Sequence, residues 1–171
     1  MRPLLLCACA AALAAAQAFR LESPAFKDGG DIPPRYACDG QNASPALTWT
    51  EPPPGTRSLA LIMLDNLASR QVVTNWVVYN IPADSRGLAS RYKWLSRLKD
   101  GTLQGRNSGN RWGYFGPCPP KGDKPHHYHI TVFAVDVDKL DADQNATAAV
   151  VGFNLHFHTL AKGVLTGVYG R

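Results

Sequence analysis

Cysteine is scarce in this chain, and the few positions that it occupies limit its chemistry. Of the four cysteines in 171 residues, Cys7 and Cys9 lie in an apolar stretch near the start, which leaves Cys38 and Cys118 in the rest of the chain. In an exported protein an even pair predicts one disulfide bond, here between Cys38 and Cys118. The alternative is a pair of unpaired, buried thiols.

Long apolar runs are also lacking. The run at 4–16 is shorter than the roughly 20 residues that a membrane-spanning helix needs, and no later segment approaches that length. It follows a basic residue and ends in small residues, a pattern typical of a secretory signal that is cut before Phe19. We therefore predict no transmembrane segment, a signal peptide over 1–18 and one domain over 19–171.

Such a leader predicts a secreted protein, extracellular, or periplasmic if the host is bacterial. Cys7 and Cys9 lie inside the apolar run and not after it, which disfavours a lipid anchor. The sequons at Asn42 and Asn145 would accept glycans in a eukaryotic host, so we expect a glycoprotein there.

The chain also lacks long runs of charge of one sign and the sequence motifs of common enzymes. The chain has 18 Lys and Arg and 13 Asp and Glu, and the basic residues form no tract. This mild, scattered charge favours solubility and predicts no nucleic-acid partner. The chain has no G-x-S-x-G motif, no P-loop and no Gly-rich nucleotide fingerprint after a strand. We therefore predict that it is not an enzyme and has no cofactor.

Most of the chain consists of short β-branched and apolar runs. They are separated by turn-forming clusters such as "EPPPGT" and "IPADSRG". They predict strands at 46–50, 58–65, 72–81, 128–137 and 164–170. The run at 58–65 is apolar almost throughout, as expected of a strand buried on both faces. The pattern favours a mostly β sandwich or barrel, with a long surface loop over 84–113.

One helix is predicted over 146–163, with Asn145 or Thr147 capping its start and Gly163 its end. At helical spacing the apolar residues of this segment form one stripe. The members of this stripe are Val150, Phe153, Phe157, Leu160, Ala161 and Val164.

All the histidines fall in two groups, and a metal site is the first possibility that they raise. On the predicted helix His156 and His158 would lie about 200° apart and diverge, whereas on a strand they would share a side and could chelate. Because spacing alone supplies no third ligand, we predict no metal. A hydrolase or metal-dependent enzyme that uses these histidines is a weaker alternative.

The other group ends the segment "GPCPPKGDKPHHYH" at 116–129. Its prolines fix the backbone and withhold N–H donors, so the segment has a preset shape. In an extended chain His126 and Tyr128 share one face while His127 and His129 share the other. A stiff loop that ends in a histidine and a tyrosine is a candidate anion receptor, and the alternative is a surface turn that leads into an edge strand.

Several separated segments resemble one known family. They are "CDGQNASPALTW", "SLALIMLD", "NWVVYNIPAD", "GYFGPCPPKGDKPHHYHITVFAVDVDKL" and "VGFNLHFHTLAKGVLTGVYGR". Together they resemble a bacterial-type phosphatidylethanolamine-binding protein, of the group that includes the Raf kinase inhibitor proteins. The resemblance implies a sandwich of two β-sheets with a few peripheral helices, one near the C-terminus, and a small pocket at the sheet ends for phosphate-type anions or phospholipid headgroups. It places in that pocket Asp65, Asn75, Gly116, Pro119, Pro120, His126 and Tyr128, with Cys118 in the same loop.

Two departures from the family pattern bear on this pocket. The family's D-P-D-A-P reads "DNLAS", which keeps Asp65 and puts Leu67 in place of an acidic residue, and the family's histidine before tryptophan is Asn75. An amide donates a hydrogen bond but carries no positive charge. Because charge-assisted hydrogen bonds are stronger than neutral ones, we expect anion affinity weaker by up to about tenfold.

The sequence thus predicts a secreted, disulfide-linked, non-enzymatic binding protein whose partner is a small anion or a phospholipid headgroup. The alternative is a protein-interaction or inhibitor protein, similar to protease or kinase inhibitors, in which the pocket is vestigial.

Overall fold

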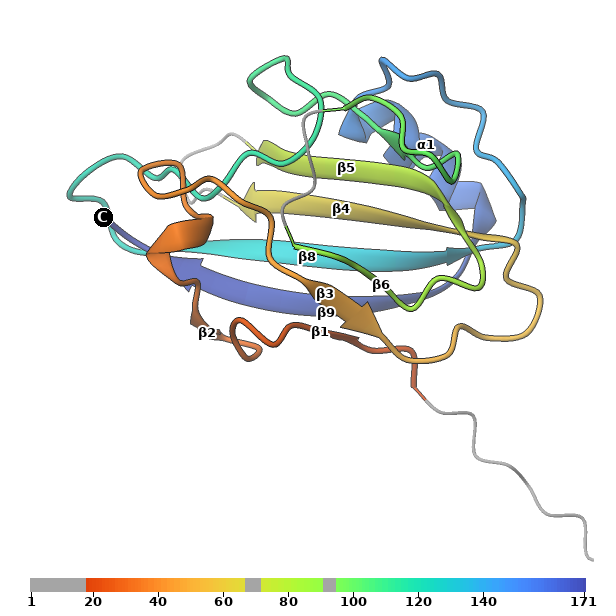
Figure 1. Cartoon of the computed structure of the whole chain (residues 1–171), viewed down its shortest axis with the longest axis horizontal. Helices are drawn as coiled ribbons and strands as arrows, with labels where there is room; N and C mark the ends of the chain where they lie inside the picture. The colour runs from red at the N-terminus through yellow and green to blue at the C-terminus, as the bar shows by residue number, and fades with distance from the viewer. Residues whose placement is uncertain (1–17, 67–71, 91–94) are drawn as a thin grey trace, which may run out of the picture.

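The computed structural model describes residues 18–66, 72–90 and 95–171 (Figure 1). The predicted signal peptide, apart from Ala18, and Leu67 lie outside these ranges. Along the chain the elements are β1 (Leu21–Glu22), β2 (Gly30–Asp31), the 3₁₀ turn η1 (Pro34–Tyr36), β3 (Leu47–Trp49), β4 (Ser58–Asn66), β5 (Val72–Pro82), β6 (Gly87–Leu88), β7 (Leu103–Gln104), β8 (His126–Val135), α1 (Ala148–His158) and β9 (Thr159–Tyr169).

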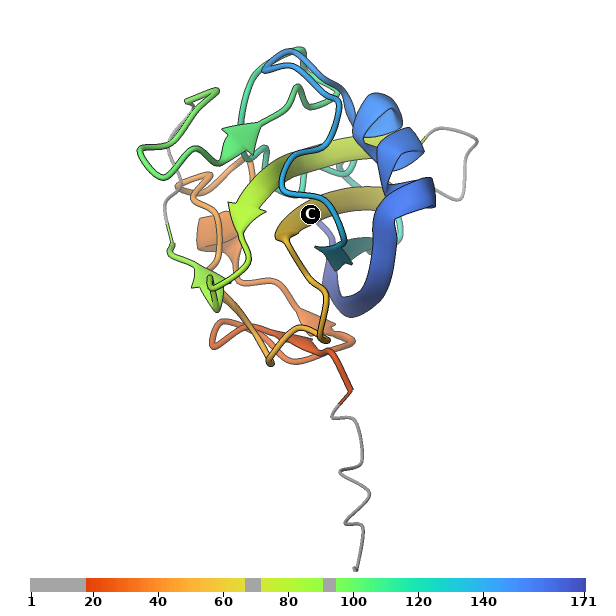
Figure 2. The same ribbon diagram turned by 90° about the vertical axis from the view of Figure 1, so that its right-hand side faces the viewer.

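Two sheets and one helix form three layers. The larger sheet has the strand order β2-β9-β8-β4-β5-β7, and the smaller one has the order β1-β3-β6. All neighbouring strands are antiparallel except β2 and β9, which are parallel. The smaller sheet lies over one face of the larger sheet and α1 over the other (Figures 1 and 2). The mostly β, two-sheet architecture that the sequence predicts is therefore confirmed.

Strand β4 is the centre of both hydrophobic cores, because side chains that alternate along a strand project to opposite faces. Leu59, Leu61 and Met63 pack in the core beneath the smaller sheet. Ala60 and Ile62 pack in the core beneath α1. The prediction of a strand buried on both faces is confirmed for this element.

The predicted helix is wrong at its C-terminal end. It ends at His158, and Gly163 lies in β9 opposite Val132 instead of capping a helix. Residues from Thr159 onward pair with β8, whose edge offers hydrogen bonds to their backbone groups, and Ala161 is partly buried against the core. Thr147 occupies the N-cap position but makes no side-chain capping bond.

The predicted apolar stripe is not one helical face. The helix buries Val151 and Leu155, whereas Phe153 is 68% exposed and Phe157 63% exposed. The stripe assumed that one helix continued through Val164, and the change to a strand at Thr159 removes that common face. The result is an exposed apolar surface, which we call the α1–β9 patch. Its members are Val150, Phe153, Phe157, Leu160 and Val164.

The region at 84–113 is irregular over most of its described length, as predicted, and contains only the short strands β6 and β7 in the part that the structure describes. Within the described ranges no helix has both the length and the hydropathy to cross a membrane.

Cys38 and Cys118 form the predicted disulfide, with a Cα–Cα distance of 5.4 Å. The bond joins the turn after η1 to the proline-rich loop, and the Cys38 N–H donates to Pro117 O beside it at 3.0 Å. Two segments 80 residues apart are thereby held together at one end of the larger sheet.

Replacing both cysteines by serine should lower the free energy of unfolding by about 4 kcal/mol, because the 80-residue loop would regain its freedom in the unfolded chain. Urea denaturation of the oxidised protein and of the double variant measures this difference. Equal midpoints and slopes for the two proteins would contradict it.

Candidate functional site

Three of the predicted site residues meet where β4 and β8 lie side by side. Asp65 on β4 is opposite Tyr128 on β8 in the sheet register. His126 precedes Tyr128 by two positions, so both side chains are on the same face, as the sequence predicts. The His126 Nδ1 atom is 2.9 Å from Asp65 Oδ2. The rings of His126 and Tyr128 stack with their centroids 6.5 Å apart. A carboxylate oxygen only accepts, so His126 Nδ1–H is the donor.

Asn75 joins this group through an irregularity in the neighbouring strand. Met63 is opposite Trp76 and Leu64 is opposite Thr74, so Asn75 is the extra residue of a β-bulge. A bulge changes the direction in which the side chain of its extra residue points. The Asn75 Nδ2 atom donates to Phe115 O at 2.9 Å and more weakly to Gly116 O at 3.4 Å.

The proline-rich loop is held by hydrogen bonds to Asn42, which precedes it in the chain, and to Arg171, which follows it. The Gly116 N–H donates to Asn42 Oδ1 at 2.7 Å, and a side chain at Gly116 would run into the backbone of Tyr36. The C-terminal Arg171 donates from Nε to Pro119 O at 2.6 Å. Pro119 is buried, whereas Pro120 is exposed and lies at the rim.

We call this arrangement the sheet-end site. It consists of Asp65, Asn75, His126, Tyr128 and the loop Gly116–Pro120. The structure brings together the residues that the sequence predicts, with Asn42 and Arg171 as supports that sequence reasoning missed. A hydrogen bond between segments more than 50 positions apart leaves no signal in a single sequence.

Charges of both signs surround the site. Asp123 Oδ2 is 3.7 Å from His126 Nε2 on the side away from Asp65. Arg171 lies 3.7 Å from Asp39, whose other carboxylate oxygen accepts from the Tyr169 hydroxyl at 2.8 Å. The hydrogen bond from Tyr169 lowers the pKa of Asp39, so this carboxylate stays charged beside the arginine.

Tyr128 is fully buried and stays a neutral phenol. Desolvation by burial raises its pKa most, and the nearby negative charge of Asp65 raises it further. The backbone amide of Cys118 and the Arg171 charge act in the opposite direction without cancelling these effects. The hydroxyl therefore keeps its proton and can donate one hydrogen bond.

Unsatisfied polar atoms are concentrated at this site. In the described ranges, the buried side-chain atoms without a hydrogen-bond partner are Asp65 Oδ1, Asn75 Oδ1, Tyr128 Oη and, before β7, Thr102 Oγ1. Buried polar atoms are nearly always satisfied in folded proteins. Asn75 and Tyr128 both interact with the loop at 116–118, so three of the four atoms lie at one location. The Asp65 carboxylate and the Cys118 amide nevertheless act on the Tyr128 hydroxyl, so this hydroxyl has polar neighbours.

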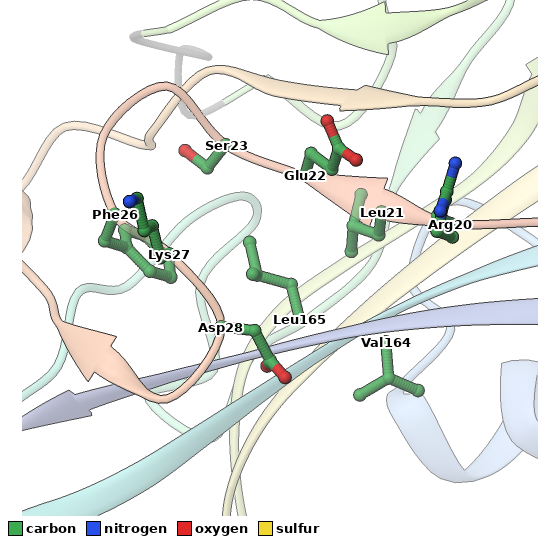
Figure 3. Close-up of a pocket in the computed structure, with 9 residues that line it drawn as sticks. All are labelled: Arg20, Leu21, Glu22, Ser23, Phe26, Lys27, Asp28, Val164 and Leu165. Carbon is green, nitrogen blue, oxygen red and sulfur yellow. The ribbon is translucent and has the colours of Figure 1, made fainter.

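A separate hollow of about 400 Å³ lies between the N-terminal segment and β9 (Figure 3). Leu21, Val164 and Leu165 line it, and Arg20, Glu22, Lys27 and Asp28 bring charges of both signs to it. It contains none of the predicted site residues, and no motif in the sequence marks it.

The other predicted features lie away from the sheet-end site. His158 is on the helix, where Nδ1 contacts Asp136 Oδ1 at 2.9 Å, and the ring of His156 packs against Phe157. In the part of the chain that the structure describes, no group of three or more His, Cys, Asp or Glu side chains is arranged to hold a metal ion. Of the two sequons, Asn145 is exposed, whereas the Asn42 side chain is engaged with Gly116.

Comparison with known proteins gives the family. The family model described as phosphatidylethanolamine-binding protein matches residues 22–170. A UPF0098 protein of Methanothermobacter thermautotrophicus is 43% identical over 151 residues, which cover 88% of this chain and 98% of the relative. The UPF0098 protein YbhB of Escherichia coli is 38% identical and covers 88% of this chain and 99% of its own.

Solved structures agree with this result. The crystal structure of Escherichia coli YbcL, described as a new member of the mammalian PEBP family, has a TM-score of 0.83 at 35% identity and covers 90% of this chain and 98% of YbcL. A putative PEBP homologue from Chlamydia trachomatis has a TM-score of 0.78 at 30% identity, with coverage of 90% and 98%. The chain belongs to the phosphatidylethanolamine-binding protein family, and within it resembles the bacterial members.

Gly116→Ala should lower the free energy of unfolding by about 1 to 3 kcal/mol, because its new methyl group would lie 2.2 Å from the Tyr36 carbonyl oxygen and force the loop to move. Gly152→Ala on α1 is the matched control, since nothing lies within 4 Å of that methyl group and the helix should gain up to about 1 kcal/mol. Thermal denaturation of both variants makes the comparison. A loss of stability in the control alone would contradict the packing described for the loop.

Proposed function

We propose that this protein is a secreted, non-enzymatic binding protein whose sheet-end site takes a small phosphoryl headgroup. The observation that carries the proposal is the group of three unsatisfied buried polar atoms on Asp65, Asn75 and Tyr128 beside a stiff loop. Asp65 Oδ1 and Asn75 Oδ1 only accept, so a ligand group that donates hydrogen bonds to them would remove a penalty of about 1 to 3 kcal/mol for each. Family membership supports a ligand of the phospholipid-headgroup type.

Recognition suits these residues better than catalysis. The His126 ring is held by Asp65 at Nδ1, and the burial that keeps Tyr128 protonated makes it a hydrogen-bonding group and not a base. Cys118, which borders the site, is in the disulfide and cannot act as a nucleophile.

The leader at 1–18 and the disulfide support export, since disulfides persist in oxidising compartments. A relative named putative lipoprotein LppC from Mycobacterium tuberculosis, 38% identical over 123 residues that cover 72% of this chain and 58% of LppC, supports a location at the cell envelope.

Titration calorimetry with phosphorylethanolamine tests the headgroup proposal. We expect saturable binding to the parent protein and affinity about tenfold weaker for His126→Ala, because the loss of Nδ1–H releases the Asp65 carboxylate that the ring orients. His158→Ala removes a histidine that also contacts an aspartate, but on α1, and should bind like the parent. The absence of saturable binding heat with the parent protein would contradict the headgroup proposal.

The α1–β9 patch favours a second candidate, binding of another protein. Clustered apolar side chains that are exposed mark an interaction site in many soluble proteins. Phe153 and Phe157 are its most exposed members, and their rings pack edge to face with centroids 5.2 Å apart. In this function the sheet-end site is vestigial.

Exchanging Phe153 and Phe157 for serine should abolish a stoichiometric partner complex recovered from the secreted fraction, because the apolar contact area is lost. His126→Ala should leave the same complex intact. A complex that depends on His126 and tolerates both serines would exclude the patch as the binding surface.

A further inference from the structure

Part of strand β9 has a neighbouring strand on one side only. The larger sheet ends in the order β8-β9-β2, but β2 pairs with β9 only at Gly167 and Val168. The backbone of Thr166 is also engaged, since its N–H donates to Asp28 Oδ1 and its C=O accepts from the Gly29 N–H, both at 2.8 Å. Before Thr166, β9 pairs with β8 alone among the described residues.

Two residues in this stretch direct their backbone groups away from β8. Both backbone groups of Thr166 face outward, and the direction alternates along an antiparallel strand, so those of Val164 and Lys162 face outward as well. Within the described ranges nothing hydrogen-bonds to them on that side. We call Lys162 and Val164 the open β9 edge. It offers two N–H donors and two C=O acceptors to a further strand.

The hollow of about 400 Å³ lies beside this edge, between β1 and β9 (Figure 3). Val164 and Leu165 line it from β9 and Leu21 from β1, and Asp28 closes it where the edge is already engaged. Leu21 and Leu165 belong to the core beneath the smaller sheet. A strand added to β9 would direct every second side chain toward that side of the sheet. The hollow is therefore placed to receive these side chains.

The remaining side chains of an added strand would lie on the face that carries α1. Gly163 faces β1, since a methyl group there would be 2.9 Å from the Leu21 nitrogen, so Lys162 and Val164 on either side of it face the opposite way. Val164 is 49% exposed and, with Leu160, is the part of the α1–β9 patch that β9 contributes. Apolar contacts are thus available on both faces of the open β9 edge.

Lys162 adds a charge to the edge. It is exposed and has no salt bridge with any other described residue. Opposite charges across a strand pair stabilise it and like charges destabilise it, so an acidic side chain suits the position opposite Lys162. A second copy of this chain suits it less, because antiparallel pairing centred on Lys162 would set two lysines opposite each other. Pairing centred nearer Thr166 would run into the segment at 28–29.

We propose that the open β9 edge binds an extended segment of a partner protein as an additional strand, with an acidic side chain opposite Lys162 and apolar side chains two positions to either side of it. The inference rests on the second proposed function, binding of a protein, and specifies the form and chemistry of the partner. Backbone hydrogen bonds to Lys162 and Val164 supply affinity, and side chains that alternate between the hollow and the α1–β9 patch supply specificity.

A fluorescently labelled peptide of sequence "KTLVEVLTK", blocked at both ends, tests the inference. Its glutamate would lie opposite Lys162, its leucines on the face of the α1–β9 patch and its valines toward the hollow. We expect saturable binding by fluorescence anisotropy, with slower hydrogen exchange at the backbone amides of Lys162 and Val164. A peptide with lysine in place of the glutamate should bind about threefold to tenfold more weakly.

Two methylated peptides test the backbone pairing separately. Methylation of the glutamate nitrogen removes the N–H that would donate to β9 and should weaken binding about tenfold. Methylation of a valine nitrogen is the matched control, because that N–H would point away from β9, and binding should stay within about threefold of the parent peptide.

A charge exchange in the protein tests the role of Lys162. Lys162→Glu should reverse the preference, so that the lysine peptide binds more tightly than the glutamate peptide. Lys121→Glu is the matched control, since Lys121 is equally exposed but lies in the proline-rich loop, and it should keep the preference of the parent protein.

Equal binding of the two methylated peptides, or the same preference in Lys162→Glu as in the parent protein, would overturn the inference. So would a concentration-dependent dimer that protects the Lys162 and Val164 amides without peptide, because the edge would then belong to a second copy. If the partner complex that requires Phe153 and Phe157 persists in these cases, the protein-binding function stands and only the added strand fails. If that complex is absent as well, both fail.

Discussion

The position of β4 between β5 and β8 is the constraint on which the rest of the structure depends. Its apolar side chains supply both cores, so a shift of register by one residue would exchange the side chains of the two faces. The same register sets Asp65 opposite Tyr128 and leaves Asn75 in the bulge. The burial that stabilises the sheet therefore also positions the polar groups at its end.

The polar groups at that end are held by contacts distant in sequence. The disulfide fixes the loop to the turn after η1, and Asn42 and Arg171 hold its backbone from the two ends of the chain. Preorganisation of this kind lowers the entropic cost of binding a small ligand.

The sequence predicted the longer strands because they leave local signals, whereas the set of site residues came from the resemblance to a family. The strand at 58–65 is apolar at nearly every position, and the alternation that sets His126 and Tyr128 on one face needs only an extended backbone. The bulge at Asn75 depends on the register of β5 against β4, which no single segment encodes. The helix was overextended because Thr159 begins a strand whose pairing with β8 overrides local helical periodicity, and this leaves Phe153 and Phe157 exposed.

The central claim is that the buried polar groups at the sheet end bind a phospholipid-type headgroup. A crystal structure of the protein with phosphorylethanolamine tests it most directly. The account predicts the ligand in contact with the sheet-end site, with its polar atoms at hydrogen-bond distance, about 2.7 to 3.2 Å, from the site's side chains. An empty site with the ligand bound elsewhere would contradict it.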